Sequence, residues 1–196
     1  MKKLILLTVV SISIGFNIQG QETYQISQEN STIEWIGEKV SGAHSGYINL
    51  LNAFFLFEEE KLVGGEFNID MNSIKCTDIE NPTYAAKLEE HLKNPDFFNS
   101  SKYPTSNFKI TSIIFDGTSY MITGNITIKD ISQEISFPAK FENDGDLFHA
   151  NATLKINRTK HDIKYGSGSF FDDLGDRMIY DEFTLKIHLQ GSKTKD

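Results

Sequence analysis

The chain has 196 residues, of which 39% are hydrophobic and 12% aromatic, and its formal net charge at pH 7 is −8. This length suits one domain with a substantial core. The acidic balance argues against nucleic acid and anionic membrane surfaces as partners, because both carry negative charge. The single cysteine, Cys76, cannot form an internal disulfide, so packing and hydrogen bonding must stabilise the fold.

The first 20 residues have the pattern of a secretory signal peptide. Met1-Lys2-Lys3 is basic, Leu4 to Ile14 is mostly apolar, and Gly20 is a small residue at which a signal peptidase could cut. The apolar run is shorter than the stretch of about 20 residues that a membrane-spanning helix needs, and no later stretch qualifies as a transmembrane segment. We therefore expect residues 1–20 to be a signal peptide, residues 21–196 to be one exported domain, and the location to be periplasmic or secreted.

Beyond residue 21, apolar and polar residues alternate along most of the chain, as between Phe148 and Ile156. This alternation predicts strands with one apolar and one wetted face. Short turn signals separate the runs, at residues 58–61, 116–117, 129–130 and 143–146. Such short connections favour antiparallel hairpins between consecutive strands.

Several of the expected strands are long, and long strands in a meander tend to close on themselves, which removes exposed edges. We therefore expect an all-β fold: an antiparallel, eight-stranded barrel. A two-sheet sandwich is the alternative, although sandwich strands are usually shorter and linked by longer connections.

One segment breaks the alternation. Four of its residues recur at helical spacing: Tyr84, Leu88, His91 and Leu92. This spacing predicts one short amphipathic helix over residues 83–93, which Asn94-Pro95 ends. The aromatic pair Phe97-Phe98 follows. The helix is either a connector packed on its apolar face or a lid over one end of the barrel.

Four motifs occur in chain order: Trp35 to Gly46, Gly64 to Met71, His91 to Phe98 with Tyr103-Pro104, and Gly124 to Pro138. Together they resemble the YceI-like family of exported lipid-binding domains. The resemblance covers roughly residues 23–189. It implies an elongated lipocalin-like barrel whose apolar bore holds a long polyprenyl or quinone-like chain. The spacing within Arg158 to Phe171 departs from the family pattern, so the head-group specificity of other members is not carried over.

The alternation places one set of side chains inside the barrel, where they would line the bore and contact the ligand. This inward set is Trp35, Phe67, Ile69, Phe108, Ile110, Phe137, Phe141, Phe148, Leu154, Phe183 and Leu185. Lys39, His44 and Arg158 are expected near the mouth, either in contact with a head group or as surface charge and strand-end packing. An eight-stranded barrel holds packed side chains or one slender ligand, so a hollow bore and a filled core both stay open.

The sequence contains no evident catalytic or metal-binding motif. The five histidines lack metal-ligand spacing, and no serine lies in a G-x-S-x-G elbow. Asp172 to Asp176 lacks the alternating ligands of a calcium loop. We therefore expect neither enzyme activity nor a metal, and no cofactor other than a bound isoprenoid or quinone lipid.

Two functions fit these observations. The first is an exported carrier or sequestering protein that binds a long-chain amphiphilic lipid. The alternative is a non-enzymatic interaction module with a filled core, which presents the long loop at residues 159–180 to a protein partner. Exposure of Phe170-Phe171 in that loop would favour the module, and folding of this pair over the mouth would favour the carrier. The sequence also leaves a homodimer open.

Overall fold

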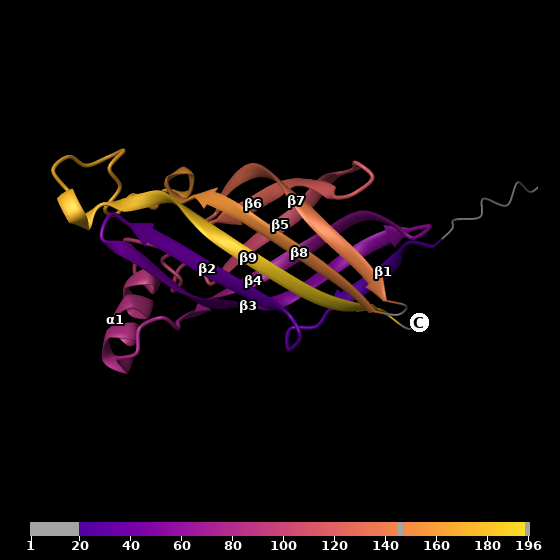
Figure 1. The fold of residues 1–196 in the computed structure, drawn as a ribbon, viewed down its shortest axis with the longest axis horizontal. Coiled ribbons are helices and arrows are strands. Elements are labelled where there is room, and N and C mark those ends of the chain that lie inside the picture. Colours follow the sequence, from indigo (N-terminus) through magenta and orange to yellow (C-terminus); the bar gives the residue numbers. More distant parts are fainter. Residues whose placement is uncertain (1–19, 145–146, 195–196) are drawn as a thin grey trace, which may run out of the picture.

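The computed structural model describes residues 20–144 and 147–194. Apart from Gly20, the expected signal peptide lies outside the described residues and stays a prediction. The described strands are β1 (Glu22–Ile26), β2 (Thr32–Lys39), β3 (Gly42–Glu58), β4 (Lys61–Cys76), β5 (Thr105–Phe115), β6 (Tyr120–Ile128), β7 (Ile131–Asp144), β8 (Leu147–Asn157) and β9 (Ile179–Lys193). They form an elongated barrel with the helix α1 (Pro82–Lys93) at one end (Figure 1).

The barrel is a closed antiparallel ring of eight strand positions. β2 to β9 follow one another around it, and the ring closes because β2 pairs with β9 as well as with β3. The short strand β1 pairs with the parts of β3 and β9 that extend beyond β2. β1 and β2 therefore share one position, interrupted at residues 27–31. This arrangement confirms the expected barrel and excludes the sandwich.

The tight turns follow the sequence signals. Lys129 and Asp130 join β6 to β7 with φ of 52° and 60°, and Glu59 and Glu60 join β3 to β4 with φ of 48° and 64°. Two successive positive φ angles suit the twist of antiparallel hairpins. The turn expected at residues 143–146 lies partly outside the described residues.

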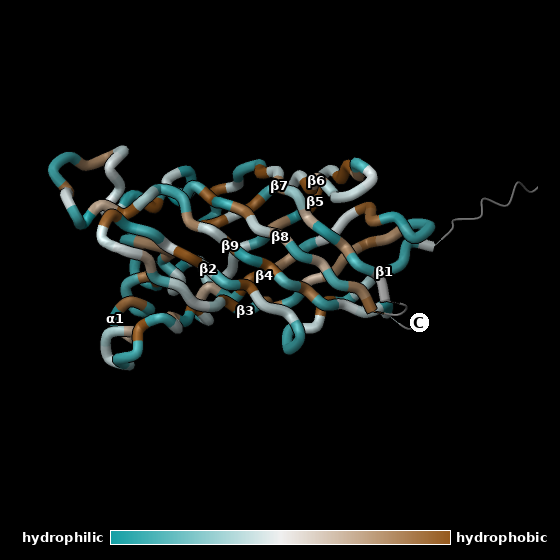
Figure 2. The backbone as a smooth tube through the Cα atoms, viewed as in Figure 1, coloured by the Kyte–Doolittle hydropathy of each residue, from teal (hydrophilic) through white to brown (hydrophobic). Residues whose placement is uncertain are grey.

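The hydropathy of the chain alternates along the strands (Figure 2), and the apolar side chains point inward to a common core. At the β1 end, five rings pack together: Tyr24, Phe55, Phe57, Phe141 and Phe148. Centroids of the contacting pairs are 4.7–6.1 Å apart, and most pairs are tilted or edge-to-face, as favourable ring contacts require. We call this cluster the aromatic floor, because it fills that end of the bore.

The helix α1 lies at the end opposite β1 (Figure 1). Asn81 caps it, since its side-chain oxygen accepts hydrogen bonds from the backbone N–H groups of Thr83 and Tyr84 at 3.0 and 3.3 Å. The helix therefore begins one residue earlier than expected and ends, as expected, at Lys93.

The expected apolar face of α1 is wrong at Tyr84, which is 61% exposed. Ala85 is the buried residue of the helix instead. Polar contacts with β4 determine this orientation of the helix. The Glu89 carboxylate accepts hydrogen bonds from the Cys76 backbone N–H at 3.0 Å and from Lys75 Nζ at 2.9 Å. These contacts turn the face that contains Ala85 and Glu89 toward β4, so Tyr84 points to solvent.

The connection from β8 to β9 begins with the 3₁₀ helix η1 (Arg158–His161) and contains a second one, η2 (Gly175–Arg177). His161 is 1% exposed, and its Nδ1 lies 3.0 Å from the Ile131 carbonyl oxygen at the start of β7. Burial lowers the pKa of His161, so the neutral imidazole donates this bond. Ile163 and Ser167, which follow η1, are also fully buried, and only a later part of the loop projects away from the barrel, at upper left in Figure 1.

Candidate binding site in the barrel bore

A cavity of about 260 Å³ occupies the bore between the aromatic floor and α1. Most of the residues that line it are aliphatic or aromatic. The core of the barrel is therefore not filled along its whole length, and the cavity can accept an apolar chain.

Nearly all of the expected inward set lies in the cavity wall. The residues that line it are Trp35, Phe67, Ile69, Phe108, Ile110, Phe137, Phe141, Leu154, Phe183 and Leu185. Phe148 does not: it is 2% exposed and packs within the aromatic floor against Phe55 and Phe57. Its strand position faces inward as expected, but lies where the bore is already filled. Whether the wall residues contact a ligand stays a prediction.

The wall also contains residues that the sequence did not assign to it. Leu88 and Leu92 of α1 and the following pair Phe97-Phe98 line the cavity at its second end. Phe98 packs against Phe183 of β9, with ring centroids 6.1 Å apart. The helix and the aromatic pair thus cover this end of the bore, as the lid alternative expected. Helical spacing marked Leu88 and Leu92 as buried, but no signal in the sequence showed what they face.

We call the end of the bore opposite the aromatic floor the mouth. One hydrogen bond fixes the Trp35 side chain near this end. Its indole Nε1 donates to the Lys75 carbonyl oxygen of β4 at 3.1 Å, over the intervening strand β3. Gly46 of β3 is the register partner of Trp35. A Cβ atom at Gly46 would lie 1.7 Å from the Lys75 carbonyl oxygen, so only glycine allows this close approach.

His44 belongs to a polar cluster at the mouth. Its Nδ1 lies 3.0 Å from Asp78 Oδ2, while Asp78 Oδ1 accepts hydrogen bonds from the Ser45 backbone N–H at 3.0 Å and the Cys76 thiol at 3.1 Å. Partial burial opposes ionisation of Asp78, but the bonds from Ser45, Cys76 and His44 outweigh it and lower the pKa. Burial, followed by the bond to Asp78, raises the pKa of the Cys76 thiol, which is therefore no activated nucleophile.

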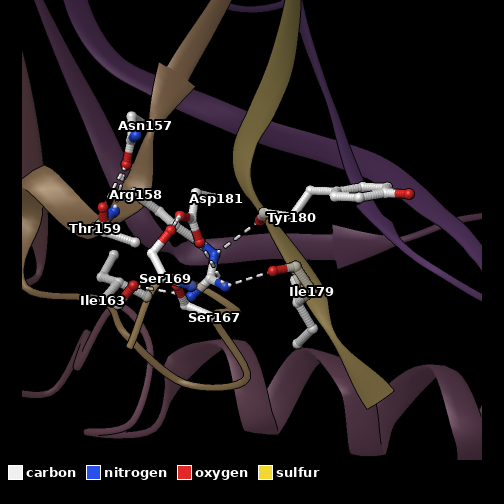
Figure 3. Close-up of polar contacts among 9 residues, drawn as sticks. All are labelled: Asn157, Arg158, Thr159, Ile163, Ser167, Ser169, Ile179, Tyr180 and Asp181. Atoms are coloured by element: carbon white, nitrogen blue, oxygen red, sulfur yellow. Dashed lines mark hydrogen bonds and ion pairs between the residues drawn. The ribbon is translucent and has the colours of Figure 1, made fainter. Parts of the chain in front are cut away.

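Arg158 also borders the cavity, but its donors point to the backbone (Figure 3). It is 4% exposed, and it donates to the carbonyl oxygens of Ile163 at 2.8 Å, Ile179 at 3.0 Å and Tyr180 at 3.1 Å. Desolvation lowers the pKa of Arg158, which nevertheless stays charged because guanidinium is so basic. Arg158 thus fixes the long loop to the start of β9.

The Arg158 charge is balanced by Asp181, whose Oδ1 lies 3.7 Å from Nη2. Ser169 Oγ donates to Asp181 Oδ2 at 2.5 Å. Burial opposes ionisation of Asp181, but hydrogen bonds from Ser167 and Ser169 and the Arg158 charge together lower its pKa. The pair is therefore ionised and joins both ends of the loop (Figure 3).

Other kinds of site were also considered. Within residues 20–144 and 147–194, no three His, Cys, Asp or Glu side chains are grouped so that they could hold a metal ion. None of the helices in these ranges combines the length and the hydrophobicity that a transmembrane span requires.

The sequence model of the family described as the YceI-like domain matches residues 24–191 of this chain. The chain belongs to the YceI-like family. It is similar to Protein YceI of Escherichia coli O157:H7, with 29% identity over 151 residues, which cover 74% of this chain and 75% of that protein. This membership confirms the resemblance inferred from the four sequence motifs.

Two solved structures share the fold of this YceI-like chain. BcnA of Burkholderia cenocepacia has a TM-score of 0.67 and 21% identity, and the match covers 84% of this chain and 98% of BcnA. A polyisoprenoid binding domain from Saccharophagus degradans has a TM-score of 0.63 and 9% identity, and the match covers 87% of this chain and 98% of that domain. At these identities the likeness concerns the fold alone.

Proposed function

We propose that this YceI-like protein is an exported carrier or sequestering protein that binds one long-chain amphiphilic lipid, polyisoprenoid or quinone-like, in its bore. The observation that carries the proposal is the apolar cavity of about 260 Å³ between the aromatic floor and α1. Burial of a hydrocarbon chain there contributes about 0.8 kcal/mol per methylene group. The fold likeness to a polyisoprenoid binding domain supports this ligand class, and the signal-peptide pattern of residues 1–20 supports export.

The distribution of polar groups gives the ligand a direction. The floor is aromatic, whereas Lys39, His44 and Glu182 line the cavity at the opposite end. Lipid pockets need only a few polar groups to fix orientation. The apolar tail therefore points toward the floor, and the head group lies at the mouth beside β2, β3 and β9.

A protein-interaction module is the second candidate function, because one observation favours it. Phe170 and Phe171 are 50% and 51% exposed, and neither lines the cavity. The acidic residues Asp172 and Asp173 follow directly, and Asp176 is three residues beyond Asp173. The pair suits a partner surface, although the version of this proposal with a filled core conflicts with the cavity.

The test is the lipid content of the protein itself. Native protein is purified without detergent, extracted with organic solvent and analysed by mass spectrometry. We expect about one long-chain isoprenoid or quinone-like lipid per protein, with the same amount in the Phe170→Ser/Phe171→Ser variant, whose changed side chains lie outside the bore. Absence of lipid, together with failure of lipid-free protein to bind an added polyprenyl or quinone chain, would reject the carrier and leave the interaction module.

A further inference from the structure

His44 lies between the apolar bore and solvent. It belongs to the inward row of β3, with Ile48 and Leu50 further along, and all three line the cavity. Its side chain is 37% exposed. The imidazole is thus the first polar group that a head group at the mouth would meet on β3.

The hydrogen bonds around His44 determine which ring nitrogen carries the proton. The ionised Asp78 carboxylate can only accept hydrogen bonds, so the His44 Nδ1 at 3.0 Å must be the donor. Asp78 is itself held by Ser45 and Cys76. The His44 Nε2 atom has no hydrogen-bond partner among the described residues, and in the neutral ring it presents a lone pair.

Apart from Lys39, the other charged groups at the mouth are poorly suited to an acceptor-only or strongly anionic head group. Glu38 and Glu182 line the cavity and are themselves acceptors, while the Arg158 donors are directed to backbone carbonyls. Lys39 supplies a donor on a long, flexible stem. A hydroxyl, by contrast, can donate to a fixed acceptor.

We propose that His44 Nε2 accepts a hydrogen bond from the ligand, so that the bore selects an amphiphile whose head group carries a hydroxyl, such as a prenol or a quinol. This inference rests on the proposed carrier function and adds the chemistry of the head group. His44 is the specificity-determining residue, and Asp78 is a positioning residue that fixes the tautomer.

The test compares geranylgeraniol with its methyl ether, in which a methyl group replaces the hydroxyl hydrogen, so that only the alcohol can donate a hydrogen bond. Binding to lipid-free wild-type protein is measured at pH 8.5, at which free histidine is neutral. One hydrogen bond to a fixed acceptor should favour the alcohol by about tenfold in Kd. In ¹⁵N-labelled protein, the His44 Nδ1 should be the protonated nitrogen.

Asp78→Asn gives the sharpest outcome. The amide oxygen of this variant can still accept hydrogen bonds from Ser45 and Cys76. The amide NH₂ group, however, donates to His44 Nδ1, so the neutral imidazole must carry its proton on Nε2. The preference should then disappear or reverse toward the ether. Glu34→Gln is the matched carboxylate-to-amide control, since Glu34 pairs with Lys186 at 3.3 Å and does not line the cavity; it should keep the wild-type preference.

His44→Phe provides a second variant if Asp78→Asn does not fold, and it should bind both probes equally. Equal binding of the two probes to wild-type protein, or an unchanged preference in His44→Phe, would overturn the head-group inference and leave the carrier function standing. Failure of the wild-type protein to bind either probe would overturn both.

Discussion

Arg158 combines three roles in one side chain: it borders the cavity, satisfies backbone carbonyls and balances Asp181. The sequence placed it at the mouth but left open whether it meets a head group or packs a strand end. Its hydrogen bonds support strand-end packing. The bonds could not be predicted, because Ile179 and Tyr180 lie 21 and 22 residues away, and side-chain patterns do not reveal where backbone carbonyls point.

We expect Arg158→Met to lower the free energy of unfolding by about 3–5 kcal/mol, because it leaves Asp181 without its cation and three carbonyls without a donor. Lys155→Met is the control: its pair with Glu182 has side chains 62% and 55% exposed, so the loss should stay within about 1 kcal/mol. Urea unfolding measures both. Near-normal stability combined with lost lipid binding would instead assign Arg158 to the head group.

Among the elements, α1 shows that residue spacing can predict the bounds of a helix but not which of its faces packs against the barrel. Periodicity and Asn94-Pro95 located the helix to within one residue, since both signals are local. The face that docks was misassigned at Tyr84 because it depends on Glu89, whose partners Lys75 and Cys76 belong to β4. Long-range polar contacts of this kind leave no periodic trace in the sequence.

The element η1 makes stability depend on pH through His161. Since burial lowers the pKa of His161, the unfolded chain takes up a proton below about pH 6.5 that the folded chain does not. This contribution to stability is complete above that pH and is lost as the pH falls, by at most about 1.4 kcal/mol per pH unit. We expect His161→Gln to flatten the decline in unfolding free energy between pH 7.5 and 5.5.

Asn157→Ala separates this effect from simple weakening of η1. The Asn157 side chain accepts a hydrogen bond from the Thr159 backbone N–H at 2.9 Å and does not titrate. Its removal should cost about 1 kcal/mol at every pH and leave the wild-type slope. The same slope in His161→Gln as in wild type would show that His161 does not carry the pH dependence.

At the scale of the molecule, alternation and short turns were sufficient to predict the closed barrel. They could not predict where along the barrel axis each inward residue lies. Phe137 and Phe148 are equivalent by pattern, yet one borders the cavity and the other lies in the floor. Tyr24 and Phe57 pack against Phe148 in the floor, whereas Phe137 contacts Phe108 in the cavity wall. Whether the bore is hollow at a given level depends on the position of each inward side chain along the barrel axis, which alternation does not specify.

The hollow bore can be tested with this pair of phenylalanines. Phe137→Trp should place extra volume in the cavity, so that binding of geranylgeraniol weakens while the unfolding free energy changes by less than about 1 kcal/mol. Phe148→Trp should overpack the filled floor and cost about 1–3 kcal/mol, with binding by the folded protein retained. Denaturant unfolding and lipid binding are measured on both variants. If Phe137→Trp costs as much stability as Phe148→Trp and leaves binding unchanged, the wall at Phe137 has no free space and the ligand must lie elsewhere.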